Sequence, residues 1–131
     1  MVNKIHHIGV AVNNVEEVAE LFRDVFGCRV EGVKDAGGMK AAFVFAGDTE
    51  IELLEDHRPD SPIGKFLQTR GEGIHHLSFE VDDIEATLKE LKARGMELID
   101  EKSRIGVHNV PIAFINPKST RGVLVELCQK T

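Results

Sequence analysis

The chain has 131 residues, of which 42% are hydrophobic and 29% charged, and this is the composition of one compact globular domain. Its formal net charge of −6, from 22 acidic and 16 basic residues, argues against a broad nucleic-acid-binding surface. Because no apolar run approaches the roughly 20 residues that span a bilayer, and no leader pattern opens the chain, we expect a cytoplasmic protein without a membrane partner.

The first predicted element is a strand, KIHHIGVAV at 4–12, which a helix follows. Asn13 is a predicted N-cap, Glu16 stands three residues later in a capping-box arrangement, and Gly27 ends the helix. Three short β-rich segments come next, at 28–34, 39–46 and 49–55. The first half is therefore predicted to fold as a βαβββ module over about 1–58.

A short connecting helix is predicted within about 60–71, because Ser61 is a suitable N-cap, Pro62 suits the first turn and Gly71 suits the end. The second half, about 73–131, then repeats the first. GIHHLSFEV at 73–81 is a second copy of the opening strand. Asp82 and Glu85 form the next predicted capping box, Gly95 ends that helix, and the β-rich segments are 96–102, 110–116 and 122–128.

Two modules of about sixty residues do not fit a solenoid, which needs three or more short units. The sequence instead predicts one domain over 1–131 of the α+β class. In this interpretation two pseudo-symmetric βαβββ modules form paired curved sheets. Each sheet has one face covered by its helix, and the other faces form a shared cleft.

The last strand of each half carries a glutamate inside an apolar pattern, Glu52 in EIELLE and Glu126 in VLVELC. The repeat makes these two positions equivalent, and it also makes the His6–His7 doublet equivalent to the His75–His76 doublet. Alternation along a strand puts the two histidines of a doublet on different faces, so each remains a candidate at this point.

A divalent cation would remove the cost of burying these glutamates, which amounts to several kcal/mol for an unpaired carboxylate. Two imidazoles and two carboxylates form a mixed nitrogen and oxygen ligand set suited to Zn, Co, Mn, Ni or Fe. Four protein ligands leave one or two positions for water or substrate. The pattern therefore predicts a metal site to which each module gives one histidine and one glutamate.

The paired modules with HHIGVAV, IELLE, GIHHLSFEV and GVLVEL resemble the vicinal oxygen chelate superfamily, which includes glyoxalase I, extradiol dioxygenases and bleomycin-resistance proteins. Within it, GDTEIELLE, DSPIGKFLQTRGEGIHHLSFEVDDI and RIGVHNVPIAFINPKSTRGVLVEL resemble the methylmalonyl-CoA epimerase family over nearly the whole chain. Carried over by position, this resemblance implies metal ligands at His7, Glu52, His76 and Glu126. His6 and His75 are then structural neighbours of the ligands.

The resemblance also implies a reaction, the interconversion of (R)- and (S)-methylmalonyl-CoA by removal of the C2 proton through a metal-stabilised enolate. The substrate would be an acyl-CoA thioester, and the cofactor a divalent ion such as Co, Zn, Mn or Ni. Because members of the superfamily commonly dimerise, we expect a homodimer.

The acid/base residue is where this chain departs from its relatives. The family usually has a glutamate before a Gln-Gly or His-Gly pair at the start of the third strand, whereas KDAGGMKAAF places Ala36 and Gly37 there. Asp35 is adjacent but shorter, and a shift by one residue in a strand reverses the face. Three explanations stay open: Asp35 acts after a loop rearrangement, Glu126 leaves the metal to act as the base, or the substrate differs.

Other functions of the superfamily remain alternatives. A glyoxalase I type isomerase would act on a hemithioacetal, but the short central connector disfavours it. A non-catalytic, ligand-sequestering protein would have lost the metal, and four ligand-type residues argue against that. An extradiol dioxygenase needs a site of two histidines and one carboxylate, so the fourth ligand Glu52 counts against it.

Overall fold

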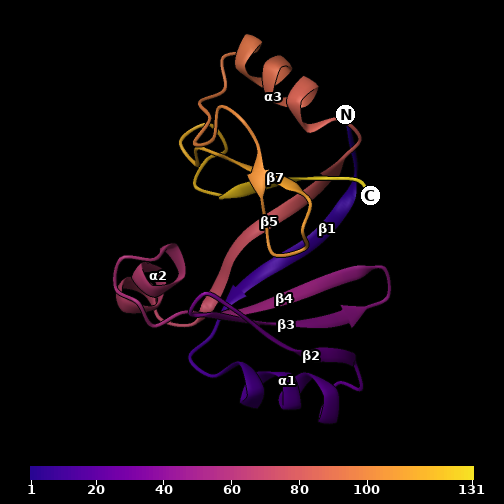
Figure 1. Ribbon diagram of the computed structural model, residues 1–131, viewed down its shortest axis with the longest axis vertical. Helices are drawn as coiled ribbons and strands as arrows, with labels where there is room; N and C mark the ends of the chain where they lie inside the picture. The colour runs from indigo at the N-terminus through magenta and orange to yellow at the C-terminus, as the bar shows by residue number, and fades with distance from the viewer. The chain divides into compact units, whose positions relative to one another are not determined.

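The computed structural model describes residues 1–131 except the side chain of Ala36 (Figure 1). The chain divides into two compact units, which we call the N-terminal unit (residues 7–75) and the C-terminal unit (residues 1–6 and 76–131). Among the described residues, no helix combines the length and the apolar character that a membrane span requires.

The N-terminal unit carries a sheet with the strand order β2-β3-β4-β1. β1 and β4 run parallel, and the other neighbours are antiparallel. Helix α1 lies against one face of this sheet (Figure 1). The elements are β1 (Val2–Ala11, from residue 7 on), α1 (Val15–Asp24), β2 (Arg29–Ala36), β3 (Met39–Ala46), β4 (Thr49–Glu55) and α2 (Pro62–Arg70).

The C-terminal unit repeats this order as β5-β8-β7-β6, again with its first strand parallel to its last. Helix α3 packs on β7 and β8. The elements are β5 (Gly73–Val81, from residue 76 on), α3 (Ile84–Ala93), β6 (Arg104–Ile105), β7 (Pro111–Ile115) and β8 (Val125–Gln129). The predicted α+β class and the repeated βαβββ order are therefore confirmed.

Each sheet buries alternate residues under its helix. In the N-terminal unit, the core between α1 and the sheet consists of Val12, Val15, Ala19, Ala42, Val44 and Leu53. In the C-terminal unit, the core between α3 and the sheet consists of Val81, Ile84, Leu88, Ala113, Ile115, Val125 and Leu127. The face opposite α1 is also apolar at one end, where α2 packs on Ala11, Ala41, Phe43 and Leu54 through Ile63. In the regular strands, alternate residues thus face the helix and the opposite side of the sheet.

The predicted helix starts are wrong by one residue in both modules. Asn14, not Asn13, accepts the N–H of Glu17 at 3.0 Å, and Asp83, not Asp82, accepts the N–H of Ala86. Val15, the first residue of α1, is fully buried in the core. Its burial fixes where the helix begins and makes Asn14 the N-cap. Its N–H donates to the Glu55 carboxylate at 2.9 Å.

The C-terminal module repeats this arrangement, because the N–H of Ile84 donates to Gln129 Oε1 at 3.0 Å. The last residue of the fourth strand therefore binds the start of the helix in both units. The connecting helix has the predicted ends, with Ser61 as N-cap and Gly71 as C-cap.

The predicted strand at 96–102 is not formed, and only an isolated bridge joins Leu98 to Ile115. The N–H of Phe114 is taken by the side chain of Asp100 at 2.8 Å rather than by a strand carbonyl. The N–H groups of Ile99 and Asp100 both donate to the carbonyl of Phe114. A side-chain acceptor thus replaces the regular ladder, and the two-residue β6 at 104–105 forms the edge instead.

Candidate metal centre

The N-terminal unit brings His7 and Glu52 together from the parallel strands β1 and β4. The Nε2 atom of His7 lies 3.4 Å from Oε2 of Glu52, and the residues are only 2% and 3% exposed. Gly9 stands opposite Glu52 in the strand register, so the histidine lies two residues before the partner of the glutamate.

The C-terminal unit builds an equivalent pair from β5 and β8. The Nε2 atom of His76 lies 3.9 Å from Oε2 of Glu126, and both residues are buried. Ser78 stands opposite Glu126 in the register, again two residues after the histidine. The ring of Phe114 packs edge-on against the imidazole of His76, with 5.5 Å between the ring centroids.

Both pairs lie on the sheet face that is turned away from the unit's α1 or α3, which we call the site face. In the N-terminal unit, Glu52 alternates with Leu53, whose side chain packs under α1. In the C-terminal unit, Glu126 lies between Val125 and Leu127, which pack with α3. The repeat thus places one imidazole and one carboxylate at the same position of each unit.

The donor set of each pair fits a divalent cation. Two ligands that are each about 2.1 Å from one cation stand roughly 3 to 3.5 Å apart, close to the spacing of His7 and Glu52. Burial of a carboxylate is unfavourable without a nearby positive charge, which a divalent cation would provide. The buried histidine and glutamate residues are therefore consistent with a divalent metal site, and imidazole nitrogen with carboxylate oxygen suits first-row metals.

Two further residues on the site face were not identified from the sequence. Glu50 offers a carboxylate within 4.8 Å of the ligand atoms of His7 and Glu52. Its counterpart in the repeat is Leu124, so this carboxylate is specific to the N-terminal unit. Ser78 is fully buried, and its hydroxyl has no hydrogen-bond partner among the described residues. Strand alternation in HHLSFEV, which sets Ser78 on the face of His76, is the signal that marks it.

The first histidine of each doublet makes ring contacts instead. His6 packs edge-on against His108, with the ring centroids 5.0 Å apart. His75 packs in the same way on Phe66 of α2, at 5.2 Å. That these two residues are structural neighbours of the ligands stays a prediction.

Asp35 is not brought to the His7–Glu52 pair. It is exposed, and its cross-strand partner is Lys40, whose ammonium group binds Glu16 of α1 at 3.3 Å. Asp35 therefore lies on the helix face, opposite the predicted ligands, as the one-residue shift implies. Ala36, where the family has its glutamate, has its side chain outside the described part of the structure.

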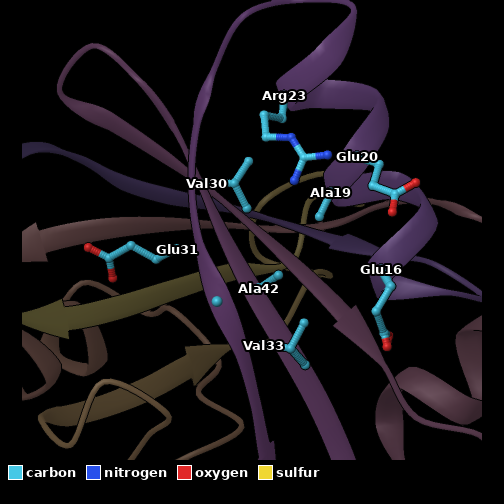
Figure 2. A pocket seen from close by; sticks show the side chains of 9 residues that line it. Glu16, Ala19, Glu20, Arg23, Val30, Glu31, Val33 and Ala42 are labelled. Carbon is cyan, nitrogen blue, oxygen red and sulfur yellow. The ribbon is translucent and has the colours of Figure 1, made fainter.

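A pocket between α1 and β2 lies on the helix face as well. Figure 2 shows Glu16, Glu20 and Arg23 of α1 on one side and Val30 and Val33 of β2 on the other. No histidine is among its lining residues. The carboxylate of Glu31 is directed away from the helix in this view (Figure 2). Its cross-strand partner is Phe43.

The chain matches known proteins over nearly its full length. Residues 6–114 match the Glyoxalase/Bleomycin resistance protein/Dioxygenase superfamily. A mitochondrial methylmalonyl-CoA epimerase of Dictyostelium discoideum is 41% identical over an alignment of 132 positions, which covers 98% of this chain and 80% of that protein. An ethylmalonyl-CoA/methylmalonyl-CoA epimerase of Cereibacter sphaeroides is 35% identical, over 98% of this chain and 99% of its own.

A solved structure agrees with these sequence matches. The methylmalonyl-CoA epimerase of Streptomyces coelicolor, in complex with 2-nitronate-propionyl-CoA, superposes with a TM-score of 0.92. It is 29% identical, and the match covers 100% of this chain and 96% of that one. The chain thus belongs to the glyoxalase/bleomycin resistance protein/dioxygenase superfamily, and over its full length it is homologous to methylmalonyl-CoA epimerases.

Proposed function

We propose that this protein is a divalent-metal-dependent epimerase that interconverts (R)- and (S)-methylmalonyl-CoA. The observation that carries the proposal is the buried imidazole–carboxylate pair that both units repeat, in a chain homologous to epimerases along its whole length. In this proposal His7, Glu52, His76 and Glu126 are the ligands of one cation, as the repeat and the resemblance predict.

The bound cation would supply positive charge beside the thioester carbonyl as the negative charge of the enolate develops. The imidazoles of His7 and His76 hold their positions because they are buried and packed in the sheets, His76 against the ring of Phe114. Neutral imidazole nitrogens are the form that suits this role.

We assign the removal of the C2 proton to Glu126, which would leave the metal to act as the base. The C2–H bond breaks, the proton passes to a carboxylate oxygen, and the electron pair moves toward the thioester oxygen. A proton donated to the opposite face of C2 by a second acid or by water gives the other epimer, and Glu126 then releases its proton to water. Asp35 remains the second predicted acid/base, but its exposed position on the helix face requires the 35–38 hairpin to rearrange first.

Proton exchange at C2 tests this function. We expect the metal-loaded protein in deuterated water to incorporate deuterium into methylmalonyl-CoA, and EDTA to stop the exchange. The substitution E126Q should lower the rate by at least about a hundredfold, since general base catalysis contributes about 10²–10⁴. The control E97Q, at an exposed position of the same unit, should keep the rate. Absence of exchange in the metal-loaded protein would overturn the proposal, and activity with methylglyoxal and a thiol would support a glyoxalase instead.

A further inference from the structure

The two units repeat more of the site face than the His–Glu pair. Phe43 of β3 stands directly opposite Glu52, and Phe114 of β7 stands directly opposite Glu126. Cross-strand partners share a face, so each glutamate has an aromatic ring beside it on the site face.

Each of these rings carries a cation from the edge strand. The Nζ atom of Lys34 lies 5.6 Å from the ring centroid of Phe43, and Cζ of Arg104 lies 5.6 Å from that of Phe114. Both distances are within the range of a cation–π contact. The cross-strand partner of Lys34 is Ala41, and that of Arg104 is Ile112. In each unit this partner lies two residues before the phenylalanine of the same strand. The units therefore repeat a row of cation, ring, carboxylate and imidazole.

Lys34 reaches the site face because of an irregularity in β2. Glu31 is paired with Phe43 and Lys34 with Ala41, so the register shifts between them. Strict alternation after Glu31 would place residue 33 on the site face and turn Lys34 to the helix. The extra residue of the bulge shifts the alternation by one position, so that Lys34 lies on the site face.

Arg104 is held in place by a different device. Its Nε lies 3.4 Å from Oδ1 of Asp100, and the other oxygen of Asp100 accepts the N–H of Phe114 at 2.8 Å. One carboxylate therefore links the guanidinium to the backbone of the residue whose ring it covers. A bulge in one unit and a carboxylate contact in the other therefore place a cation at the same repeated position.

We propose that Lys34 and Arg104 are substrate-binding residues that recognise the anionic groups of an acyl-CoA thioester. The proposal rests on the proposed function, whose substrate carries a carboxylate and several phosphates. A chain with a net charge of −6 repels such a polyanion unless cations line the approach to the site. Each cation stands two strands from the glutamate, about 10 Å at the usual strand spacing.

The malonyl carboxylate and the phosphates of CoA offer the same chemistry, and two ligands distinguish them. Equilibrium binding is measured for methylmalonyl-CoA and for methylmalonyl-pantetheine, which lacks the phosphates. We expect K34Q and R104Q each to weaken binding of methylmalonyl-CoA about tenfold, the loss of one charge-assisted contact. An effect that persists with the pantetheine thioester identifies the carboxylate, and an effect that disappears identifies the phosphates.

The charge-conserving variants K34R and R104K should restore binding to within about threefold. R23Q and R94Q are matched controls, because these exposed arginines pair with Asp24 and Glu90 on the helices. In turnover, R104Q should raise KM while kcat stays nearly constant, whereas a merely structural role would lower the melting temperature and leave KM unchanged. Unchanged affinity of K34Q and R104Q for both ligands would overturn the inference. Exchange at C2 by the unsubstituted protein reports separately on the proposed function.

Discussion

His7 and Glu52, from neighbouring parallel strands, place Nε2 and Oε2 3.4 Å apart in the buried part of the N-terminal unit. The same two residue types meet at the equivalent position of the C-terminal unit, in His76 and Glu126. Because the register is the same in both, one duplicated arrangement accounts for all four predicted ligands.

Metal binding should stabilise the fold. A ligand that binds only the folded state adds about 2.7 kcal/mol at a concentration one hundred times its Kd. We therefore expect Co²⁺ or Zn²⁺ to raise the melting temperature of the EDTA-treated protein by several degrees. In H76A the increase should be lost, and in the control H57A, at an exposed position, it should remain. An equal increase in both variants would contradict the assignment.

Ser78 is predicted to tolerate loss of its hydroxyl. Its Oγ is buried and has no hydrogen-bond partner among the described residues, so S78A should leave the free energy of unfolding unchanged or raise it by up to about 1 kcal/mol. The comparison is T87V, because the Thr87 hydroxyl donates to the Asp83 carbonyl at 2.8 Å and its loss should cost about 1 kcal/mol. Urea denaturation measures both, and a lower stability of S78A would show that the hydroxyl has a partner.

Asp56 should make stability depend on pH in the acid range. Its carboxylate is buried and accepts two hydrogen bonds from the Arg58 guanidinium, which hold the pKa of Asp56 below its usual value. A lowered folded-state pKa stabilises the protein above the unfolded pKa, about 3.9, and this contribution is lost as the pH falls through the folded pKa.

The substitution D56N should therefore cost about 1 to 2 kcal/mol at pH 7 and much less near pH 2.5. Thermal unfolding of both proteins from pH 7 to pH 2.5 measures the difference. A constant difference at all pH values would mean that the ionised carboxylate does not stabilise the fold.

The helix cap provides a local test of the structure. N14A should destabilise the protein by about 1 kcal/mol, because it removes the acceptor for the N–H of Glu17. N13A, one residue earlier, keeps this hydrogen bond and should change stability by less than about 0.5 kcal/mol. If chemical denaturation showed N13A to be more destabilising than N14A, Asn13 would be the N-cap, as predicted from the sequence.

The sequence was sufficient for the repeated βαβββ order because hydrophobic periodicity and the copied HHIGVAV pattern are local signals. It misplaced both helix caps because Asn13–Asn14 and Asp82–Asp83 each offer two residues of the same type. The choice depends on Glu55 and Gln129, which bind the first helical N–H from a distant strand. The predicted strand at 96–102 is likewise absent because the Asp100 side chain accepts the N–H of Phe114, in place of a strand carbonyl.

The four predicted ligands could be named because the repeat and a family resemblance fall on the same residues. The sheet face on which Lys34 and Arg104 lie could not be predicted, since it depends on a bulge and on a two-residue strand that alternation alone does not predict. Asp35 was assigned a role by its closeness in sequence to Ala36. The register shows that this neighbour lies on the other face of the sheet.

The number of divalent ions bound per chain tests the central claim most directly, that the two His–Glu pairs serve one metal. Titration of the EDTA-treated protein with Co²⁺, followed by calorimetry, should give one ion per chain. H7A and H76A should each weaken this binding by at least about tenfold, since each removes a ligand from the same ion. Two ions per chain, or an H7A variant that still binds one ion with unchanged affinity, would contradict the account.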